Sequence, residues 1–376
     1  MANIVEKLKE KHAEIAGGGF AGLTAAVALR QRGWSVRLHE KGPELRAFGA
    51  GIVLWHNGLR VLEGIDALED VLNGSMTPPV YETRRHNATV SRETFSGMPW
   101  RVMTRQHLHS ALVNKARSAG VEIAVDSEVV KADPAGAVTL ASGEVRKADL
   151  VVGADGVGSK VRDSIGFELD RDISRDGLIR LIVPRKKKEL GAGEWDNMID
   201  MWNFWPRVQR ILYAPCNEND LYLGLMAPAA DPDGSQVPIK LDTWVEMFPF
   251  LEPVLVEAAK ITSPRYDRYE TTYLKNWTRG KVALIGDAAH AMCPSLAQGA
   301  GCAMVNAYSL AVELGKISEV EEGVKAWERR MRPITDRCQT LAAELTAQRA
   351  LSKGNQQHRM AFETARYDPL RRVFSW

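Results

Sequence analysis

The sequence predicts an α/β fold in which a Rossmann-like domain carries an inserted antiparallel sheet, an α+β insert, and ends in C-terminal helices. Three observations predict this fold. Patterns of strand, glycine turn, helix and strand follow one another over residues 14–39. Apolar runs broken by prolines fill residues 173–275, and a further apolar strand at 282–285 precedes a helical stretch at 320–352. A βαβ beginning indicates a parallel sheet, whereas short runs of strand-forming residues indicate antiparallel strands.

The first elements form this βαβ unit. Glu14–Ala16 is the end of a short strand, and the helix after the glycine turn covers Phe20–Gln31, where apolar residues recur at helical spacing. Gly33 follows the helix, and Ser35–His39 is the second strand. The order of these elements is the usual start of a Rossmann-like domain.

The rest of the chain divides between the two sheets. Alternating apolar residues at 121–130 and 137–140 predict strands that lead to a further strand at 149–152. The strands expected in the insert cover residues 178–183, 198–204, 210–213 and 221–226. We assign the discontinuous Rossmann-like domain to residues 1–75, 100–172 and 276–325, the inserted sheet domain to 76–99 and 173–275, and the C-terminal helical segment to 326–376.

Composition limits the kinds of partner. Among 376 residues, 49 basic side chains nearly balance 47 acidic ones, so neither nucleic acid nor an acidic membrane surface is expected and a small molecule is the default. The charged start lacks the apolar stretch of a signal peptide and no later segment is apolar enough to span a membrane, which favours the cytoplasm. The composition leaves open whether the chain forms a homo-oligomer. The four cysteines lack disulfide or metal-ligand spacing, so buried thiols and no metal are expected: Cys216, Cys293, Cys302 and Cys338.

The glycine turn carries the first chemical signal. Gly17-Gly18-Gly19-Phe20-Ala21-Gly22 contains the G-x-G-x-x-G pattern between a strand and a helix, an arrangement that brings backbone N–H groups to a pyrophosphate. Glu40 ends the second strand, where a carboxylate can accept hydrogen bonds from ribose hydroxyls and disfavours a phosphorylated ribose. The unit therefore predicts FAD or NAD, whereas a glycine turn needed only for packing is the alternative.

Two later segments indicate whether the cofactor is FAD or NAD. A dehydrogenase would normally complete its parallel sheet within the first half of such a domain, and this chain does not. Instead, residues 149–162 supply a strand followed by an Asp155-Gly156 turn and a helix start. Residues 280–301 supply another strand that ends in Gly286-Asp287, followed by a glycine-rich turn and a helix. Each acid has a plainer reading as a turn or cap residue, but their joint occurrence favours FAD.

These three segments, in this order, resemble the p-hydroxybenzoate hydroxylase family of class A flavoprotein monooxygenases, whose members have an FAD-binding Rossmann-like domain. The resemblance implies that Gly17, Gly19, Phe20, Ala21 and Gly22 hold the pyrophosphate, with Glu40 and Lys41 at the ribose. It also implies FAD contacts by Arg46, Ala47, Arg105, Val129, Asp155, Gly156, Asp287, Ala300 and Gly301. For the last two there is a physical reason, since N–H groups at a helix start stabilise negative charge on a reduced flavin. Asn306 departs from the family, because many members carry Asp there.

Further segments resemble the members of this family that act on hydroxylated pyridine carboxylates in vitamin B6 degradation. They cover residues 46–52, 54–64, 177–184, 193–197, 199–210 and 367–372. The resemblance implies an oxygenase that uses FAD, NADH and O2, transfers oxygen through a C4a-hydroperoxyflavin, and opens the pyridine ring hydrolytically. The Ala297-Gln298-Gly299 turn resembles instead the salicylate and hydroxynicotinate hydroxylases.

A small aromatic acid requires a cationic partner and hydrogen-bonding groups around its ring. Arg180 interrupts an apolar strand, where a charge is costly unless it is paired with a substrate carboxylate or, alternatively, with a protein acid. By resemblance, the substrate pocket is lined by Tyr81, Arg180, Phe204, Arg210, Tyr222, Tyr269, Cys293 and Pro294. Of these, Tyr81, Arg180 and Tyr222 are the candidate catalytic residues, and His290 is expected to be structural.

Three alternatives remain at this level. The first is hydroxylation without ring cleavage, acting on 5-pyridoxate, hydroxynicotinate or salicylate-like acids. The second is a flavin-dependent dehydrogenase or reductase that does not use O2. The third is a flavin-binding module without turnover.

Overall fold

The computed structural model of the chain describes residues 11–45 and 50–349. The predicted FAD contacts of Arg46 and Ala47 lie outside these ranges. The first domain is built on a six-stranded sheet in the order β17-β18-β11-β1-β2-β7. Its strands are β1 (His12–Ala16), β2 (Ser35–His39), β7 (Glu122–Ala124), β11 (Leu150–Gly153), β17 (Thr278–Arg279) and β18 (Val282–Leu284). All neighbours are parallel except β17 and β18, as a Rossmann-like sheet requires.

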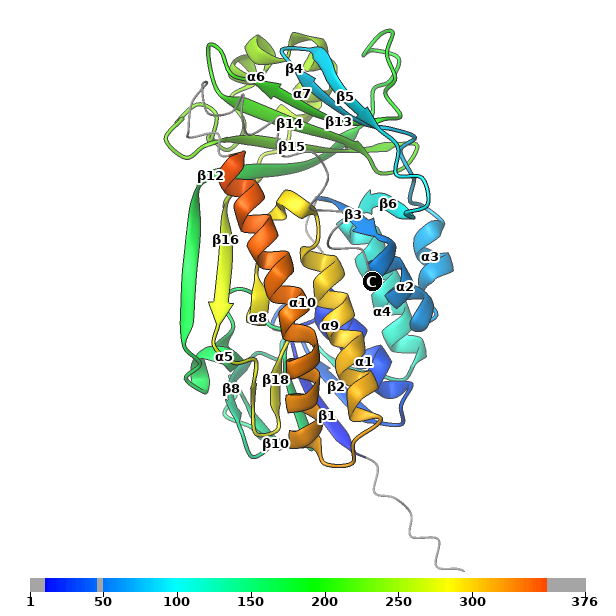
Figure 1. The fold of residues 1–376 in the computed structure, drawn as a ribbon, viewed down its shortest axis with the longest axis vertical. Coiled ribbons are helices and arrows are strands. Elements are labelled where there is room, and N and C mark those ends of the chain that lie inside the picture. Colours follow the sequence, from blue (N-terminus) through cyan, green and yellow to red (C-terminus); the bar gives the residue numbers. More distant parts are fainter. Residues whose placement is uncertain (1–10, 46–49, 350–376) are drawn as a thin grey trace, which may run out of the picture.

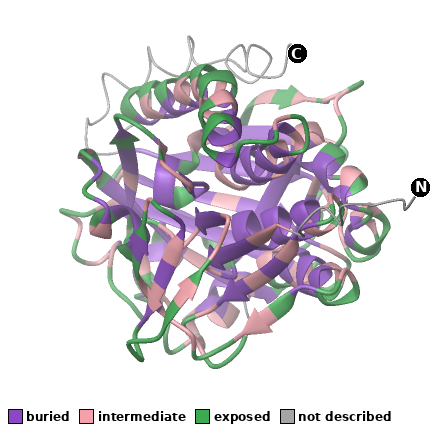
Figure 2. Ribbon diagram, turned by 90° about the horizontal axis from the view of Figure 1, so that it is seen from below, coloured by how far each residue is buried: buried purple, intermediate pink, exposed green. Residues whose placement is uncertain are grey.

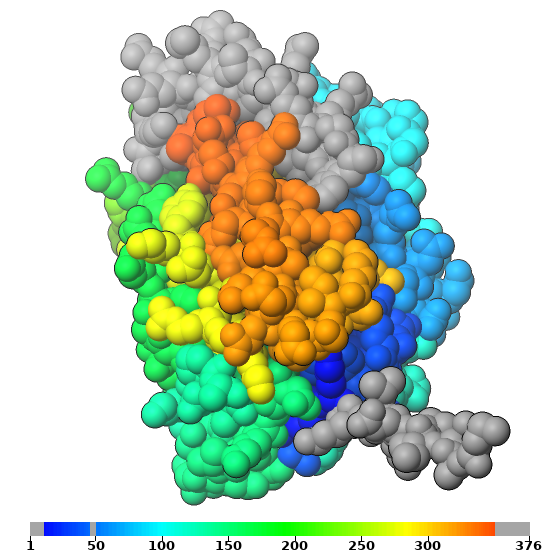
Figure 3. All heavy atoms as spheres, turned by 60° about the horizontal axis from the view of Figure 1, so that its bottom comes forward, coloured from blue at the N-terminus to red at the C-terminus, as the bar shows by residue number. Residues whose placement is uncertain are grey.

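Helices of the first domain pack beside this sheet (Figure 1). α1 (Phe20–Arg30) contacts both α4 (Arg105–Ser118) and α9 (Gly299–Leu314), and α9 in turn contacts α10 (Val320–Gln348). α10 spreads across one face of the molecule, with N-terminal segments on one side and middle segments on the other (Figure 3). α2 (His56–Gly64), α3 (Leu68–Leu72) and the short α5 (Lys160–Ser164) complete this part.

The second domain contains a seven-stranded sheet in the order β16-β12-β15-β14-β13-β4-β5. Its strands are β4 (Tyr81–Arg85), β5 (Ala88–Glu93), β12 (Leu169–Pro184), β13 (Met198–Asn203), β14 (Gln209–Pro215), β15 (Asp220–Pro228) and β16 (Tyr266–Leu274). Only β4 and β13 pair in parallel. Smaller sheets join β3 (Gly51–Trp55) to β6 (Trp100–Thr104) and β8 (Val129–Asp133) to β9 (Ala137–Leu140) and β10 (Val145–Lys147).

The second sheet has two unlike faces because successive side chains of a strand point in opposite directions. On β12, Ile179 and Leu181 belong to an apolar core with α6 (Leu241–Met247) and α7 (Glu252–Ala259). The alternate residue Arg180 lies on the other face, which is turned toward the first domain. Buried residues gather toward the centre of the molecule and exposed ones lie mostly around its outside (Figure 2). One face of this sheet therefore packs against α6 and α7, and the other face, which carries Arg180, can contribute residues to a site.

The predicted fold class is confirmed, with two differences in detail. Residues 241–259 form helices within the region that was predicted to be an antiparallel sheet, and β12 starts at Leu169, well before the predicted strand. The early part of β12 is mostly exposed and polar, so it carries no apolar signal. The predicted domain bounds themselves stay a prediction. None of the helices within the described ranges combines the length and the apolar character that a membrane crossing requires.

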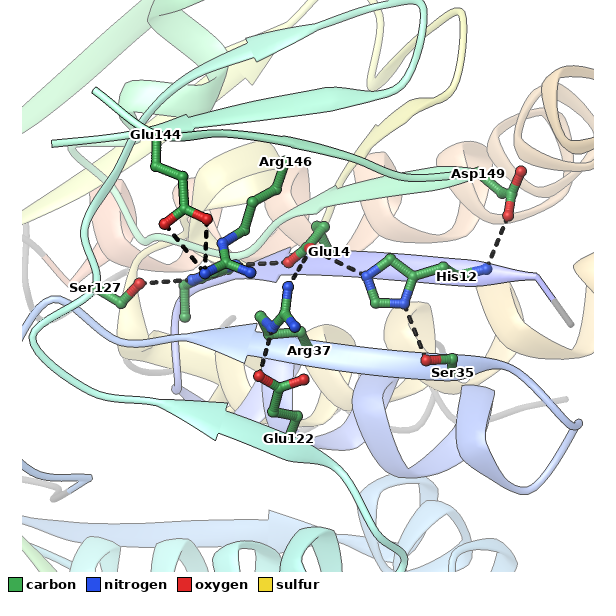
Figure 4. A network of polar contacts seen from close by, with 10 residues as sticks. His12, Glu14, Ser35, Arg37, Glu122, Ser127, Glu144, Arg146 and Asp149 are labelled. Carbon is green, nitrogen blue, oxygen red and sulfur yellow. Dashed lines mark hydrogen bonds and ion pairs between the residues drawn. The ribbon is translucent and has the colours of Figure 1, made fainter. Parts of the chain in front are cut away.

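A buried carboxylate lies in the first sheet, inside the polar network of Figure 4. Glu14 is 1% exposed and accepts hydrogen bonds from His39 Nε2 (2.6 Å), His12 Nε2 (3.0 Å) and Arg37 Nη1 (3.1 Å). Burial alone would raise the pKa of Glu14, but the hydrogen bonds from the two histidines and the charge of Arg37 lower it below the ordinary value of 4.5. The network thus stabilises the ionised form of Glu14.

Replacement of this carboxylate should lower stability in a pH-dependent way. A group whose pKa is lowered by folding stabilises the protein above its unfolded pKa, and that contribution is lost as the pH falls through the folded value. We therefore expect Glu14→Gln to reduce the free energy of unfolding by ~1–3 kcal/mol at neutral pH. In urea titrations, the difference from the unmodified protein should shrink as the pH falls below 4.5. An equal difference at pH 7 and at pH 4 would contradict this account.

Candidate active site

The glycine turn between β1 and α1 has the geometry of a phosphate cradle. Gly17 has a φ of +104°, and a Cβ on Gly22 would stand 2.0 Å from the carbonyl oxygen of Gly17, so both positions require glycine. A Cβ on Gly19 would meet no atom within 4 Å. The turn is thus tightly packed on its inner side and open beside Gly19, at the N-terminus of α1. An open space at this place suits a pyrophosphate.

Glu40 closes one end of this space. Its Oε2 accepts a hydrogen bond from the backbone N–H of Gly18 (3.0 Å) and its Oε1 one from Gly42 (3.0 Å). Both oxygens retain a lone pair that a ribose hydroxyl could use. The backbone of Ser127 donates to the carbonyl oxygen of Glu40, which places Val129, at the start of β8, on the same side of the molecule. Lys41 is exposed beside it.

Asp155 serves as a helix cap. Its Oδ1 accepts a hydrogen bond from the Ser159 hydroxyl (2.5 Å) and its Oδ2 one from the backbone N–H of Val161 (3.1 Å) at the start of α5. This is the plainer alternative that the sequence left open. The turn nonetheless adjoins the glycine turn, because a Cβ on Gly17 would stand 2.3 Å from the carbonyl oxygen of Ala154. Gly156 has a φ of +83° and open space around it.

Asp287 and Arg105 are close enough for the charge of each to affect the pKa of the other. Asp287 begins the short helix α8 (Asp287–His290), where it is exposed to solvent but has many protein atoms around it. Burial raises the pKa of Asp287, and Arg105 opposes this rise. Burial likewise lowers the pKa of Arg105, against the opposing charge of Asp287. The Arg105 guanidinium lies over the Phe20 ring at 4.7 Å.

The first turn of α9 carries the last of the predicted FAD contacts along the chain. Ala300 and Gly301 follow the helix start at Gly299, and a Cβ on Gly301 would stand 2.9 Å from the side-chain oxygen of Gln298. The free N–H groups of this turn could hold a negatively charged flavin. Taken together, the glycine cradle, Glu40, Asp287 and Arg105 fit the successive parts of FAD. When bound, FAD would supply redox chemistry that no side chain can perform.

Tyr222 and Arg180 are the sheet residues nearest to this end of the path. Because Arg180 pairs with Gly224 and Ile182 pairs with Tyr222, both side chains lie on the same face of the sheet. Burial raises the pKa of Tyr222, which keeps its hydroxyl protonated, while Arg180 and Arg105 oppose the rise. A Cβ on Gly51 would stand 2.3 Å from Cβ of Tyr222, so β3 packs directly against this tyrosine.

The charge of Arg180 is already paired within the protein. Its Nη1 lies 2.9 Å from Oδ2 of Asp267 on β16, and Arg265 Nη2 contacts the other oxygen at 3.0 Å. Arg180 and Asp267 are each about one-third exposed. Pairing with a protein acid was the alternative to a substrate carboxylate. The geometry therefore favours Arg180 as a hydrogen-bond donor near the flavin end rather than as the substrate's counter-ion.

A second buried pair joins β13 and β14. Arg210 donates from Nε to Asp200 Oδ1 (2.6 Å) and from Nη2 to Oδ2 (3.1 Å), and its guanidinium stacks on Trp202 at 4.6 Å. Asp200 is 1% exposed, and it raises the pKa of Arg210 despite burial, which by itself would lower it. The Tyr81 hydroxyl donates to the same carboxylate at 3.2 Å. Asp200 thus holds two of the predicted pocket residues in place.

The remaining predicted residues form an apolar wall. Tyr269, Phe204 and Cys293 belong to one buried cluster with Trp202. Burial raises the pKa of Tyr269 well above its ordinary range. The Cys293 thiol lies 3.3 Å from the Thr271 hydroxyl, and Pro294 begins the short 3-10 helix η2 (Pro294–Leu296) that follows it.

Two small cavities flank Arg210. They share Arg210, Ser295 and Arg349, and the first encloses about 80 Å³. The first is further lined by Val53, Trp55, Tyr81, Trp100, Met198, Leu212, Pro294, Leu296, Ala297 and Leu345. The second is further lined by Asp176, Trp202, Met226, Tyr269 and Thr346. The predicted residues Tyr81, Arg210, Tyr269 and Pro294 are therefore brought together, with Arg180 and Tyr222 next to them on the sheet.

Sequence reasoning missed several residues of this site. Asp200 interrupts the apolar run Ile199–Met201, so the argument applied to Arg180 could have found it as well. Trp55 and Trp100 stack at 5.6 Å; Trp55 lies within the segment 54–64 that carries the resemblance, whereas Trp100 had no signal beyond its aromatic character. Arg349, with Leu345 and Thr346, lies far in sequence from the other pocket residues, and only the path of α10 brings these three here.

Asn306, which stands where many family members carry Asp, has a structural role. Its amide nitrogen lies 2.8 Å from Nε2 of the buried His290 and 3.0 Å from the Thr335 hydroxyl, which links α9 to α8 and α10. Burial lowers the pKa of His290 to about 4, so the imidazole is neutral and a neutral amide is a suitable partner. Over the described ranges, no group of three or more His, Cys, Asp or Glu side chains is arranged to hold a metal ion.

The family follows from a comparison with known proteins. A family model for an FAD binding domain matches residues 10–342, which is most of the chain. The chain therefore belongs to this family of FAD-binding proteins, and it is an FAD-dependent monooxygenase of aromatic rings. NADH and O2 are the other reactants expected of this class.

Individual relatives narrow this class. The chain is similar to a solved structure of the tetrameric form of 2-methyl-3-hydroxypyridine-5-carboxylic acid oxygenase, with 73% identity, a TM-score of 0.90 and coverage of 96% of this chain and 98% of that one. It is 40% identical to a putative 2-heptyl-3-hydroxy-4(1H)-quinolone synthase of Rhodococcus erythropolis, over 87% of this chain and 86% of the relative. A 2-heptyl-3-hydroxy-4(1H)-quinolone synthase of Mycobacteroides abscessus is 36% identical, over 88% of each chain.

Proposed function

We propose that the protein oxygenates a hydroxylated pyridine carboxylate, with 2-methyl-3-hydroxypyridine-5-carboxylate as the substrate, and opens its ring by hydrolysis. FAD is the bound cofactor, NADH the reductant and O2 the oxidant. The 73% identity to the oxygenase named for this acid supports the substrate. The observation that carries the proposal is the position of the Arg210 cavities, which adjoin the sheet face where Arg180 and Tyr222 approach Arg105 and Asp287.

The side chains around these cavities have complementary tasks. Tyr222, protonated because it is buried, can donate to or accept from the ring hydroxyl of the substrate. Arg180 presents guanidinium N–H groups on the same face, and Tyr81 and Arg210 are fixed by Asp200. Trp55, Trp100 and the other apolar lining residues exclude water from the ring. The residues therefore orient a polar aromatic ring within a mostly dry pocket.

Labelled oxygen tests the reaction. Purified protein with FAD should oxidise NADH faster when 2-methyl-3-hydroxypyridine-5-carboxylate is present. Under ¹⁸O₂, mass spectrometry should find a ring-opened product in which a single oxygen carries the label, because the other added oxygen comes from water. A labelled product that keeps its ring would establish hydroxylation without cleavage. NADH consumption without any labelled product would instead establish a reductase.

We also infer that the enzyme works in the cytoplasm as a homo-oligomer. The tetrameric form reported for the 73% identical oxygenase supports assembly, and the need for NADH supports the cytoplasm. Light scattering of the purified holoenzyme should give a mass of at least twice the 41.6 kDa of one chain. A mass of a single chain at micromolar concentration would contradict assembly.

A further inference from the structure

The C-terminal end of α10 reaches the substrate pocket. α10 runs along the first domain and ends beside the sheet of the second domain (Figure 1). Arg349 is the residue that follows the helix, and its backbone N–H donates to the carbonyl oxygen of Leu345. Its side chain lines both cavities that flank Arg210. The C-terminal end of α10 thereby contributes a cation to both cavities.

Arg349 differs from the other arginines of the pocket in its partners. Arg210 is held by both oxygens of Asp200, and Arg180 is paired with Asp267. Among the residues that the structure describes, no carboxylate lies within ion-pair distance of Arg349, and its buried Nε has no hydrogen-bond partner.

An unpaired cation beside apolar walls is costly unless an anion completes the site. Under the proposed function, the anion that would enter this pocket is the carboxylate of the substrate. We propose that Arg349 is the counter-ion of the substrate carboxylate and determines the preference of the enzyme for ring acids, an inference that rests on the proposed function. The carboxylate then lies at the α10 end of the pocket, and Tyr222 and Arg180 are left for the opposite side of the ring.

The position of Arg349 also allows a purely structural explanation. A cation at the C-terminus of a helix is stabilised by the helix dipole. That interaction would affect the stability of α10, but it would not depend on the charge of the ligand. Dependence on ligand charge therefore separates the two explanations.

The test is a thermodynamic cycle in which the charge is removed from Arg349, from the ligand, or from both. Binding of 2-methyl-3-hydroxypyridine-5-carboxylate and of its neutral 5-carboxamide is measured by titration of flavin absorbance, in the unmodified holoenzyme and in Arg349→Gln. The substitution should weaken carboxylate binding by ~10- to 100-fold, the range for a hydrogen bond to a charged group, and carboxamide binding by less than ~2-fold. Arg349→Lys should recover part of the carboxylate affinity. Arg337→Gln is the matched control, because Arg337 is an exposed arginine on the same helix.

Each outcome has one meaning. An equal loss for both ligands, or no loss for either, would overturn the role of Arg349. An equal effect of Arg337→Gln would also overturn it, since the effect would then follow from general surface charge. If the unmodified enzyme turns over no hydroxypyridine acid, the proposed function has failed. If the unmodified enzyme does turn over a hydroxypyridine acid and the cycle shows no charge dependence, only the inference about Arg349 has failed.

Discussion

Gly19→Val should abolish tight FAD binding while leaving the apoprotein folded. Gly19 is the N-cap of α1 in an extended conformation, with φ −79° and ψ −177°, which any residue can adopt. Its Cβ would enter open space in the protein alone. We expect this space to hold the pyrophosphate in the holoenzyme, so a branched side chain would displace the cofactor from the N–H groups of the turn. We expect FAD affinity to fall by at least ~100-fold, since several charge-assisted hydrogen bonds are lost together.

Two measurements check this prediction. Fluorescence titration of the apoprotein with FAD gives the affinity, and urea unfolding of the apoprotein should show a change within ~0.5 kcal/mol, as for an open surface site. Gly22→Val provides the contrast, because its Cβ would collide with the Gly17 carbonyl oxygen at 2.0 Å and should destabilise the apoprotein itself. Unchanged FAD affinity in Gly19→Val would show that the pyrophosphate lies elsewhere.

This contrast also indicates what the sequence could predict. The fold class and the FAD segments were readable because each depends on local patterns, such as the glycine turn of Gly17–Gly22 and the strand that ends at Asp287. The path that joins these segments required only that parallel strands end at one edge of the sheet. Local sequence patterns were therefore enough to predict most residues of the candidate cofactor site.

Partners across the second sheet could not be predicted in the same way. Arg180 was recognised as a charge that needs a partner, but the choice of Asp267 depends on the pairing of β12 with β16. Asp200 and Arg210 meet because β13 and β14 are antiparallel neighbours. Arg349 enters the pocket only through the length of α10, which continues through Pro333. Such contacts join distant segments and are set by tertiary packing, which spacing along the chain does not determine.

Loss of the Asp200 carboxylate should have the largest effect on the substrate pocket. Asp200→Ala would leave the Arg210 guanidinium buried without its counter-ion and would remove the acceptor of the Tyr81 hydroxyl. Removing one partner of a buried pair typically costs ~3–5 kcal/mol. We expect a loss of this size in the free energy of unfolding and a fall of kcat/KM by at least ~100-fold, because Arg210 and Tyr81 lose their positions together. Asp267→Asn is the control, since that pair is one-third exposed and should cost less than ~1 kcal/mol.

A double substitution separates the structural from the functional part of this effect. Asp200→Leu with Arg210→Met replaces the ion pair by apolar side chains, and such replacements of buried pairs are often neutral or stabilising. We therefore expect urea unfolding to show recovery of most of the stability lost in Asp200→Ala, with FAD still bound. Turnover should stay low, because the pocket would lack the Arg210 N–H groups and a fixed Tyr81 hydroxyl. Recovery of turnover along with stability would show that Asp200 and Arg210 only support the sheet. Recovery of stability alone would show that the pair positions groups that contact the substrate.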